Sequence, residues 1–185
     1  MTASRRPAEP PDPAGPCAGA VHHIAVNVFD LERSLRFYSG VLGLRTTLRM
    51  ELAGEQFERL LRLAPGTTGR VAYVQGHERV GQIELIEWSP PPVAAPTPSP
   101  PPPGPGFAVP GLRLLSFSVS EPLGFWRERF TDHDVRCWSE PVALLLPNYG
   151  EIDAMVAEDP DGNLIEVVRL PSDEEVHAFR HGVRA

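Results

Sequence analysis

The sequence has no lysine, and all 17 of its basic residues are arginines. Without a lysine amine the protein cannot form a Schiff base, anchor pyridoxal phosphate or use a phosphate-loop lysine, which excludes several enzyme classes. Cysteine is scarce as well, because the chain has only Cys17 and Cys137. Two distant cysteines make neither a disulfide framework nor a paired-cysteine metal site.

Long apolar runs are lacking too. No stretch approaches the roughly 18 residues of a membrane-spanning helix, and Met1–Gly19 has no charged-then-apolar export signal. The formal charge is −7 and the arginines are scattered, which argues against nucleic-acid and anionic-membrane partners. We therefore expect a soluble, unexported protein of the reducing cytoplasm, with no nucleic-acid and no membrane partner.

Proline, by contrast, is in excess. Five of the 22 prolines fall within residues 1–18 and eleven within Ser89–Pro110. Such density favours an extended, solvated backbone over a packed core. The sequence therefore predicts a disordered Pro/Ala-rich tail (1–18), one folded domain (19–171) and a C-terminal tail (172–185). The proline-rich linker (89–110) divides the domain into a first module, 19–88, and a second module, 111–171.

The first module is predicted to have the order βαβ(α)ββ. Its helix begins after the N-cap Asp30, carries an apolar stripe and stops at Gly43. The stripe consists of Leu31, Leu35, Tyr38 and Leu42. The strands are expected at Val21–Val28, Leu44–Glu51, Arg70–Gln75 and Gln82–Trp88, with a short helix over Gln56–Leu63.

The second module repeats this order. Val21–Val28 aligns on Leu112–Val119 at an offset of 91, and the segment around Glu84 aligns on that around Glu166 at an offset of 82. A helix with Leu123, Trp126 and Phe130 on its stripe follows the first strand. Further strands are expected at Val135–Trp138, Ile152–Glu158 and Leu164–Leu170, the last two joined by the turn Asp159–Asn163.

Strand alternation places four side chains on the sheet faces that lack helices. These are His23 and Glu84 in the first module and their counterparts Leu114 and Glu166 in the second. A half-sheet with that face open is too small to be stable, so we expect the modules to join edge to edge. The predicted fold class is α+β, with two βαβββ modules forming one cup-shaped, half-open mixed-sheet barrel with helices outside.

These motifs together resemble the vicinal oxygen chelate superfamily, which includes glyoxalase, bleomycin-resistance and extradiol-dioxygenase proteins. The resemblance covers about Val21–Leu170. It rests on His23-Ile24-Ala25-Val26-Asn27-Val28, Asp30-Leu31-Glu32-Arg33-Ser34, Phe37-Tyr38, Gly43-Leu44, Ile83-Glu84-Leu85-Ile86 and Asp159-Pro160-Asp161-Gly162-Asn163-Leu164-Ile165-Glu166.

The resemblance implies a divalent metal in the cup, held at four positions that correspond to His23, Glu84, Leu114 and Glu166. Leucine cannot bind a metal, so His23, Glu84 and Glu166 remain as a three-ligand set suited to Zn²⁺, Mn²⁺, Ni²⁺ or Fe²⁺. The alternative is a cup without metal. A lone strand histidine is more often a satisfied or surface residue than a ligand, and strand-end glutamates are usually solvated.

The function that the resemblance implies is a metal-assisted lyase or isomerase acting on a small carbonyl-containing substrate through an enolate-like intermediate. Glu166 is the first candidate for proton transfer and Glu84 the second. Trp88, Leu114 and Ser116 are the expected pocket residues. Two alternatives stay open: a metal-free protein that binds or sequesters a small molecule, and a metal-free biosynthetic cyclase or isomerase. A homodimer is expected by resemblance alone.

Overall fold

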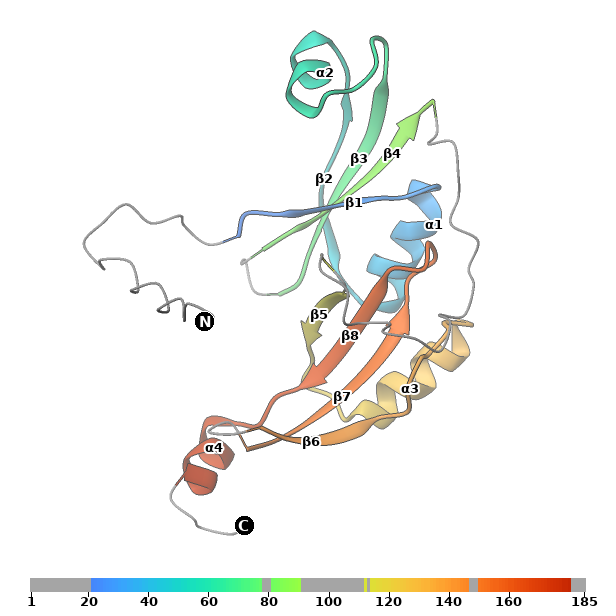
Figure 1. Cartoon of the computed structure of the whole chain (residues 1–185). Coiled ribbons are helices and arrows are strands. Elements are labelled where there is room, and N and C mark those ends of the chain that lie inside the picture. Colours follow the sequence, from blue (N-terminus) through green and yellow to red (C-terminus); the bar gives the residue numbers. More distant parts are fainter. Residues whose placement is uncertain (1–20, 78–80, 91–111, 113, 147–149, 181–185) are drawn as a thin grey trace, which may run out of the picture.

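The computed structural model describes residues 21–77, 81–90, 112, 114–146 and 150–180. They form two four-stranded mixed sheets, one in each module, with strand orders β1-β4-β3-β2 and β5-β8-β7-β6 (Figure 1). The predicted tail over residues 1–18 and almost all of the predicted linker lie outside the described residues. Within the described part, no helix is long and apolar enough to span a bilayer.

The first sheet has the expected βαβ(α)ββ order. Its strands are β1 (Ile24–Asn27), β2 (Arg45–Leu52), β3 (Thr68–Gln75) and β4 (Ile83–Ser89), with the short helix α2 (Glu55–Leu61) between β2 and β3. β1 runs parallel to β4, while β3 is antiparallel to both β4 and β2. The parallel pairing of the first and last strands requires the crossover helix between them.

That crossover differs from the regular α-helix that the sequence predicts. Asp30 caps its start as expected by accepting a hydrogen bond from the Arg33 backbone N–H. The helix α1 (Leu31–Leu35) then widens into the π-helical segment η1 (Arg36–Val41) and ends at Gly43, whose φ is +75°. All four residues of the predicted apolar stripe are buried.

The second sheet confirms the internal repeat. It contains β5 (Leu114–Ser118), β7 (Gly150–Glu158) and β8 (Leu164–Arg169), with helix α3 (Leu123–Asp132) after β5. In the first sheet Ala25 lies opposite Glu84, and in the second Ser116 lies opposite Glu166. These pairs are related by the same offsets, 91 and 82, that the sequence alignment uses.

Three elements of the second module differ from expectation. The strand expected at Val135–Trp138 is reduced to one bridge between Cys137 and Ala157. The fourth strand is instead β6 (Val142–Leu146), at the outer edge beside β7. Helix α4 (Asp173–Arg180) lies within the stretch assigned to the C-terminal tail, and α4 contacts β7.

The two modules share one hydrophobic core, to which residues of both contribute. The helical elements α1, η1 and α3 all lie on the same side of the molecule, at the right in Figure 1. Polar contacts join the modules beside this core. The buried Tyr38 hydroxyl donates to Asp159 Oδ2 at 2.8 Å, and Arg33 pairs with Asp161 in the β7–β8 turn. Arg129 of α3 also donates to the Val41 carbonyl at 2.6 Å. We call the Tyr38–Asp159 and Arg33–Asp161 contacts the module clasp.

The expected single barrel is not formed within the chain, because the sheets do not join. Each of β1 and β5 has only one neighbouring strand among the described residues, so one edge of each remains unpaired. The modules meet through helices and the clasp instead of through these edges. The sheet face opposite α1 in module one, and opposite α3 in module two, is called the open face below.

Candidate functional site: the open face of the first sheet

His23 and Glu84 lie together on the open face of the first sheet. His23 directly precedes β1, and Glu84 is in β4, the neighbouring strand. The His23 Nε2 atom lies 3.3 Å from Glu84 Oε2. Glu84 is only 7% exposed, so its carboxylate needs partners to offset the loss of hydration.

Tyr73 provides a second partner for the same carboxylate. It lies directly opposite Glu84 in the β3–β4 register, and its hydroxyl donates to Glu84 Oε1 at 2.6 Å. The Tyr73 ring also meets the His23 ring edge to face, with centroids 5.7 Å apart. Burial, together with the hydrogen bond to Glu84 and its charge, raises the pKa of Tyr73 to about 12. The hydroxyl is therefore a proton donor throughout the neutral range.

His22 contacts the outer side of His23. The two Nδ1 atoms are 2.8 Å apart, and the rings meet at 81°. β1 is an edge strand, so no neighbouring strand occupies the space beside it, and the two rings can meet there. His22, His23, Glu84 and Tyr73 therefore form a continuous row of four polar side chains.

Trp88 lies on the same open face, further along β4. Its indole N–H donates to Asn27 Oδ1 at 2.8 Å, which joins β4 to β1. The ring also covers Gly69 of β3, where an added Cβ would come within 2.9 Å of it. Trp88 thus places an aromatic ring on the same face as the polar row, four residues beyond Glu84 in β4.

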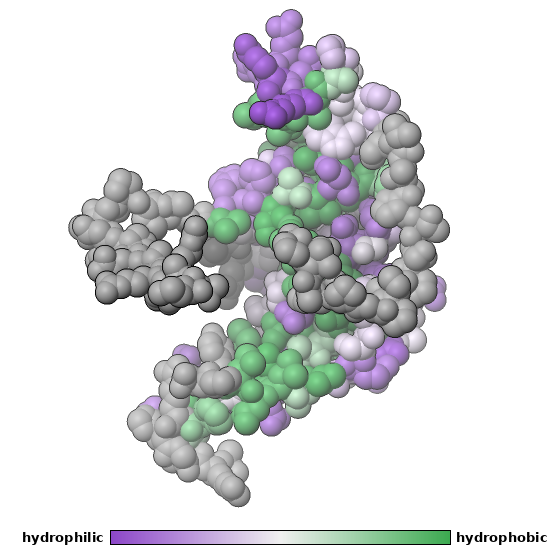
Figure 2. Space-filling view, viewed as in Figure 1, coloured by the Kyte–Doolittle hydropathy of each residue, from purple (hydrophilic) through white to green (hydrophobic). Residues whose placement is uncertain are grey.

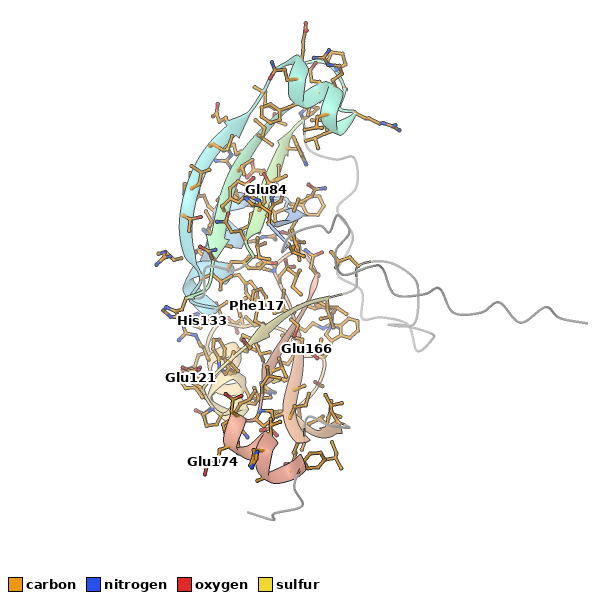
Figure 3. All side chains as sticks on the ribbon, turned by 90° about the vertical axis from the view of Figure 1, so that its left-hand side faces the viewer. Glu84, Phe117, Glu121, His133, Glu166 and Glu174 are labelled. Carbon is orange, nitrogen blue, oxygen red and sulfur yellow. The ribbon has the colours of Figure 1, made fainter. Side chains whose placement is uncertain are left out.

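Glu166 is on the second sheet, away from this row (Figure 3). Its Oε2 accepts a hydrogen bond of 2.5 Å from Ser116 Oγ. Leu114 pairs with Leu164, and Val156 occupies the position opposite Glu166 that Tyr73 occupies opposite Glu84. The second module therefore has the acid of the repeat without the histidine and the tyrosine.

The structure brings together two of the three predicted metal ligands within one chain. Over the described part of the chain, no three His, Cys, Asp or Glu side chains are grouped so as to hold a metal ion. His23 and Glu84 are adjacent, whereas Glu166 is on the other sheet. Within a single chain, two of the predicted ligands are therefore adjacent, and the third, Glu166, is separate from them.

The His23–Glu84 pair fits two neighbouring positions around a divalent ion. For metal–ligand bonds of about 2.1 Å at angles of about 90–109°, adjacent donor atoms lie roughly 3.0–3.4 Å apart. The observed 3.3 Å between His23 Nε2 and Glu84 Oε2 agrees with that spacing. Tyr73 and His22 occupy the outer atoms of the two ligands, as orienting partners of metal ligands do.

Part of the open face of the second sheet is apolar. Ile152, Ala154 and Val168 form a small cluster there. Next to it on β6, Val142 is 47% exposed and Leu144 is 42% exposed. Figure 2 shows hydrophobic side chains gathered over this part of the molecule.

A cleft of about 660 Å³ lies between the modules. It is bordered by the end of η1, the ends of β3 and β4, β5, and the start of α3. Of the three predicted pocket residues, Ser116 lines this cleft, whereas Trp88 and Leu114 are not among its lining residues. The cleft is therefore separate from the polar row on the first sheet.

Tyr73 and His22 are not among the site residues that the sequence predicts. The signal for Tyr73 was available in principle, because its position opposite Glu84 follows once β3 and β4 are joined as a hairpin in this register. Strand alternation alone turns the side chain of His22 away from that of His23, so it does not predict the observed contact between the two rings. An edge strand relaxes that rule, since a ring there can turn around the open side of the sheet.

Comparison with known proteins gives the same family as the motifs. A 2-epi-5-epi-valiolone epimerase from Actinomyces sp. is 36% identical over 78 residues, which cover 41% of this chain and 42% of the epimerase, so the match spans less than half of that protein. A crystal structure of a glyoxalase family protein from Bacillus cereus superposes with a TM-score of 0.67 at 18% identity, covering 86% of this chain and 99% of that one.

A glyoxalase/dioxygenase from Nostoc punctiforme gives a TM-score of 0.52 at 24% identity, covering 82% of this chain and 91% of the other. Both structures have the fold described above. The family model for the Glyoxalase/Bleomycin resistance protein/Dioxygenase superfamily matches residues 20–167. The chain therefore belongs to the Glyoxalase/Bleomycin resistance protein/Dioxygenase superfamily.

Proposed function

We propose that this protein is a metal-assisted isomerase or lyase that moves a proton at a carbon next to the carbonyl group of a small substrate. The observation that carries the proposal is the pairing of His23 with the buried Glu84 at metal-ligand spacing on an open sheet face. The similarity to an epimerase favours the same chemistry, because inversion of a C–H centre requires a proton to leave and return.

His23 and Glu84 are the residues that would hold the metal, and their imidazole and carboxylate donors suit Zn²⁺, Mn²⁺, Ni²⁺ or Fe²⁺. When bound, such an ion acts as a Lewis acid toward the oxygen of a carbonyl and stabilises the charge of an enolate. His23 acts as a ligand alone, whereas each glutamate has a carboxylate that can also accept a proton.

Glu166 is the first candidate for the base. Its carboxylate is half-buried and is held at one oxygen by Ser116, which leaves the other oxygen to take the proton from the substrate carbon. Glu84 is the second candidate, although Tyr73 and His23 already occupy both of its oxygens. The protonated Tyr73 hydroxyl keeps the Glu84 carboxylate oriented while the substrate reacts.

We further propose that a second copy of the chain completes the site by bringing its Glu166 toward His23 and Glu84. Three observations support this homodimer. The clasp joins α1 and η1 of the first module to the β7–β8 turn of the second, and an edge of each of β1 and β5 lacks a strand neighbour among the described residues. The exposed apolar face of the second sheet, with Val142 and Leu144, gives the partner a surface to bury.

The test of the metal site is the divalent metal content of the full chain after metal-replete purification. We expect close to one ion per chain by elemental analysis, with loss of the ion in His23→Ala and Glu84→Gln. His133→Ala, which changes an exposed histidine in the second module, is the matched control and should keep the ion. A metal-free wild-type protein, or a His23→Ala variant with full metal content, would reject the proposal.

The proton-transfer chemistry can be tested without the natural substrate. A panel of small α-hydroxy carbonyl compounds is incubated with the protein in D₂O, and the C–H signal next to the carbonyl is followed by proton NMR. We expect catalysed exchange of this hydrogen for deuterium with a subset of the compounds. The exchange should disappear in Glu166→Gln and after chelation, and exchange that survives both changes would contradict the mechanism.

A second candidate function, metal-free binding of an apolar small molecule, is favoured by the apolar cluster of Ile152, Ala154 and Val168 on the second sheet and by the cleft of about 660 Å³. Binding of this kind should survive both EDTA and the Glu84→Gln change. Metal-dependent binding would exclude it.

A further inference from the structure

His22 touches the candidate metal ligand His23 on the side of the ring that does not face Glu84. Its Nδ1 lies 2.8 Å from His23 Nδ1, whereas the other ring nitrogen of His23, Nε2, faces Glu84 at 3.3 Å. A 2.8 Å contact between two ring nitrogens requires one of them to donate and the other to accept. The direction of this hydrogen bond is therefore tied to the tautomer of His23.

In the metal-free chain the surroundings of Glu84 fix that direction. The carboxylate accepts from Tyr73 on one oxygen, and its second oxygen faces His23 Nε2. In a neutral His23 ring, a lone pair on Nε2 would be repelled by the carboxylate, so in that ring Nε2 carries the proton and Nδ1 does not. His23 Nδ1 then has the lone pair and must accept a hydrogen bond from His22 Nδ1–H.

A ligand on His23 Nε2 reverses the bond. Metal binding requires the lone pair on Nε2, which moves the His23 proton to Nδ1. His23 then donates and His22 Nδ1 must accept, which a neutral imidazole does by carrying its own proton on Nε2 instead. A neutral histidine at position 22 can serve both states, whereas an apolar ring can serve neither.

We propose that His22 is a positioning residue for His23 that changes tautomer when His23 becomes a metal ligand. The proposal rests on the metal-assisted function proposed above for the loaded state, and on geometry alone for the metal-free state. Loss of an outer-shell partner of this kind typically weakens metal binding about 10- to 100-fold. We expect about 10-fold here, because His22 is exposed and water replaces part of the interaction.

Three variants separate positioning from simple packing. His22→Phe keeps a ring against His23 but removes both nitrogens. His22→Asn keeps one amide oxygen and one amide nitrogen, either of which can turn toward His23, and should restore binding to within about threefold of wild type. His133→Phe makes the same change at an exposed histidine in the other module and should leave the affinity unchanged. Zn²⁺ affinity is measured calorimetrically with the full chain.

Side-chain ¹⁵N NMR of histidine-labelled protein at mildly alkaline pH provides the direct readout, because it shows which ring nitrogen carries the proton. Without metal, we expect the proton of His22 on Nδ1 and that of His23 on Nε2. Added Zn²⁺ should move the proton of His22 to Nε2 and that of His23 to Nδ1. His133 should show no change.

The outcomes are distinguishable. If Zn²⁺ binds but His22→Phe leaves its affinity unaltered, or if His22 keeps its tautomer on loading, the inference is overturned while the metal site stands. If Zn²⁺ does not bind at all, the proposed function fails, and the metal-free spectra still decide the inference. A His22 proton found on Nε2 in the absence of metal would overturn it.

Discussion

At the scale of single residues, the central feature is a carboxylate removed from water and held from two sides. Glu84 is 7% exposed and faces the Tyr73 hydroxyl and the His23 ring. Burial of a carboxylate is tolerated only where hydrogen bonds or opposite charges offset its lost hydration. Its repeat counterpart Glu166 is only half-buried and accepts a side-chain hydrogen bond from Ser116. The difference marks the first sheet as the half that is built around a charge.

This arrangement predicts an alkaline titration. The pKa of Tyr73 is about 12, above its ordinary value of 10, so the folded state holds the phenolic proton more strongly than the unfolded state does. The associated stability is complete below about pH 10 and is lost as the pH rises toward 12. Tyrosinate absorbance, taken as the difference between wild type and Tyr73→Phe, should therefore show a step near pH 12.

The same titration in Glu84→Gln gives the control. Removal of the carboxylate charge should lower the pKa of Tyr73, although burial still keeps it above 10. A difference step near pH 10 in the wild-type protein would show that the hydroxyl is not engaged with Glu84.

At the scale of elements, the site depends on the close pairing of β3 and β4. Gly69 lies opposite Trp88, and a Cβ at Gly69 would meet the Trp88 ring at 2.9 Å and Ile86 at 3.2 Å. The ring has little freedom to move, because its N–H is bonded to Asn27. Glycine is needed here for close approach, since nothing larger than a hydrogen fits under the indole.

Gly69→Ala should therefore destabilise the protein by about 1–3 kcal/mol through overpacking. It should also change the fluorescence of Trp88. Gly124→Ala, in helix α3, meets no atom within 4 Å and should be neutral or slightly stabilising, because alanine favours a helix. Urea unfolding of both variants checks the prediction, and equal stabilities would contradict it.

Helices and strands were predictable where the spacing of apolar residues and the positions of turn and capping residues indicated the same element. The repeat of a strand followed by a helix with an apolar stripe identified both modules, and the Asp159–Asn163 turn joins β7 and β8 as expected. The strand β6 was missed because Val142–Leu146 is continuously apolar, without the alternation that marks a strand with one buried face. Helix α4 did have a signal, the capping box in which Ser172 and Glu175 bond each other's backbone N–H groups.

At the scale of the whole molecule, the modules behave as one body because they share a core and a clasp. Tyr38 is fully buried, and its hydroxyl bonds Asp159, which is also buried and belongs to the other module. Asp159 further accepts hydrogen bonds from the Asp161 and Asn163 backbone N–H groups. The clasp therefore ties helix α1 to a rigid turn.

Tyr38→Phe should lower the free energy of unfolding by about 1–3 kcal/mol, because it leaves a buried carboxylate short of a donor. Since the core is shared, both modules should unfold in one transition. Trp88 reports on the first module, and Trp126 and Trp138 on the second, so fluorescence in a Trp88→Phe background separates them. Two transitions, with only one of them shifted by Tyr38→Phe, would contradict a single cooperative unit.

The relation between the modules is what the sequence could not predict. Alternation within a strand correctly placed His23 and Glu84 on one face, since only local geometry is involved. Whether Glu166 joins them depends on how two sheets are oriented, and that follows from long-range contacts such as Tyr38 with Asp159 and Arg129 with Val41, which no periodicity encodes. The His23–Glu84 pair was therefore predictable, whereas the position of Glu166 relative to it was not.

The most direct test of the account is a crystal structure of the full chain grown with Zn²⁺ and examined by anomalous scattering at the zinc edge. The account predicts a peak within about 2.3 Å of both His23 Nε2 and a Glu84 oxygen, with Glu166 of a second copy as a further ligand or neighbour. Zinc bound only at other sites, with the His23–Glu84 pair unchanged beside it, would contradict the account.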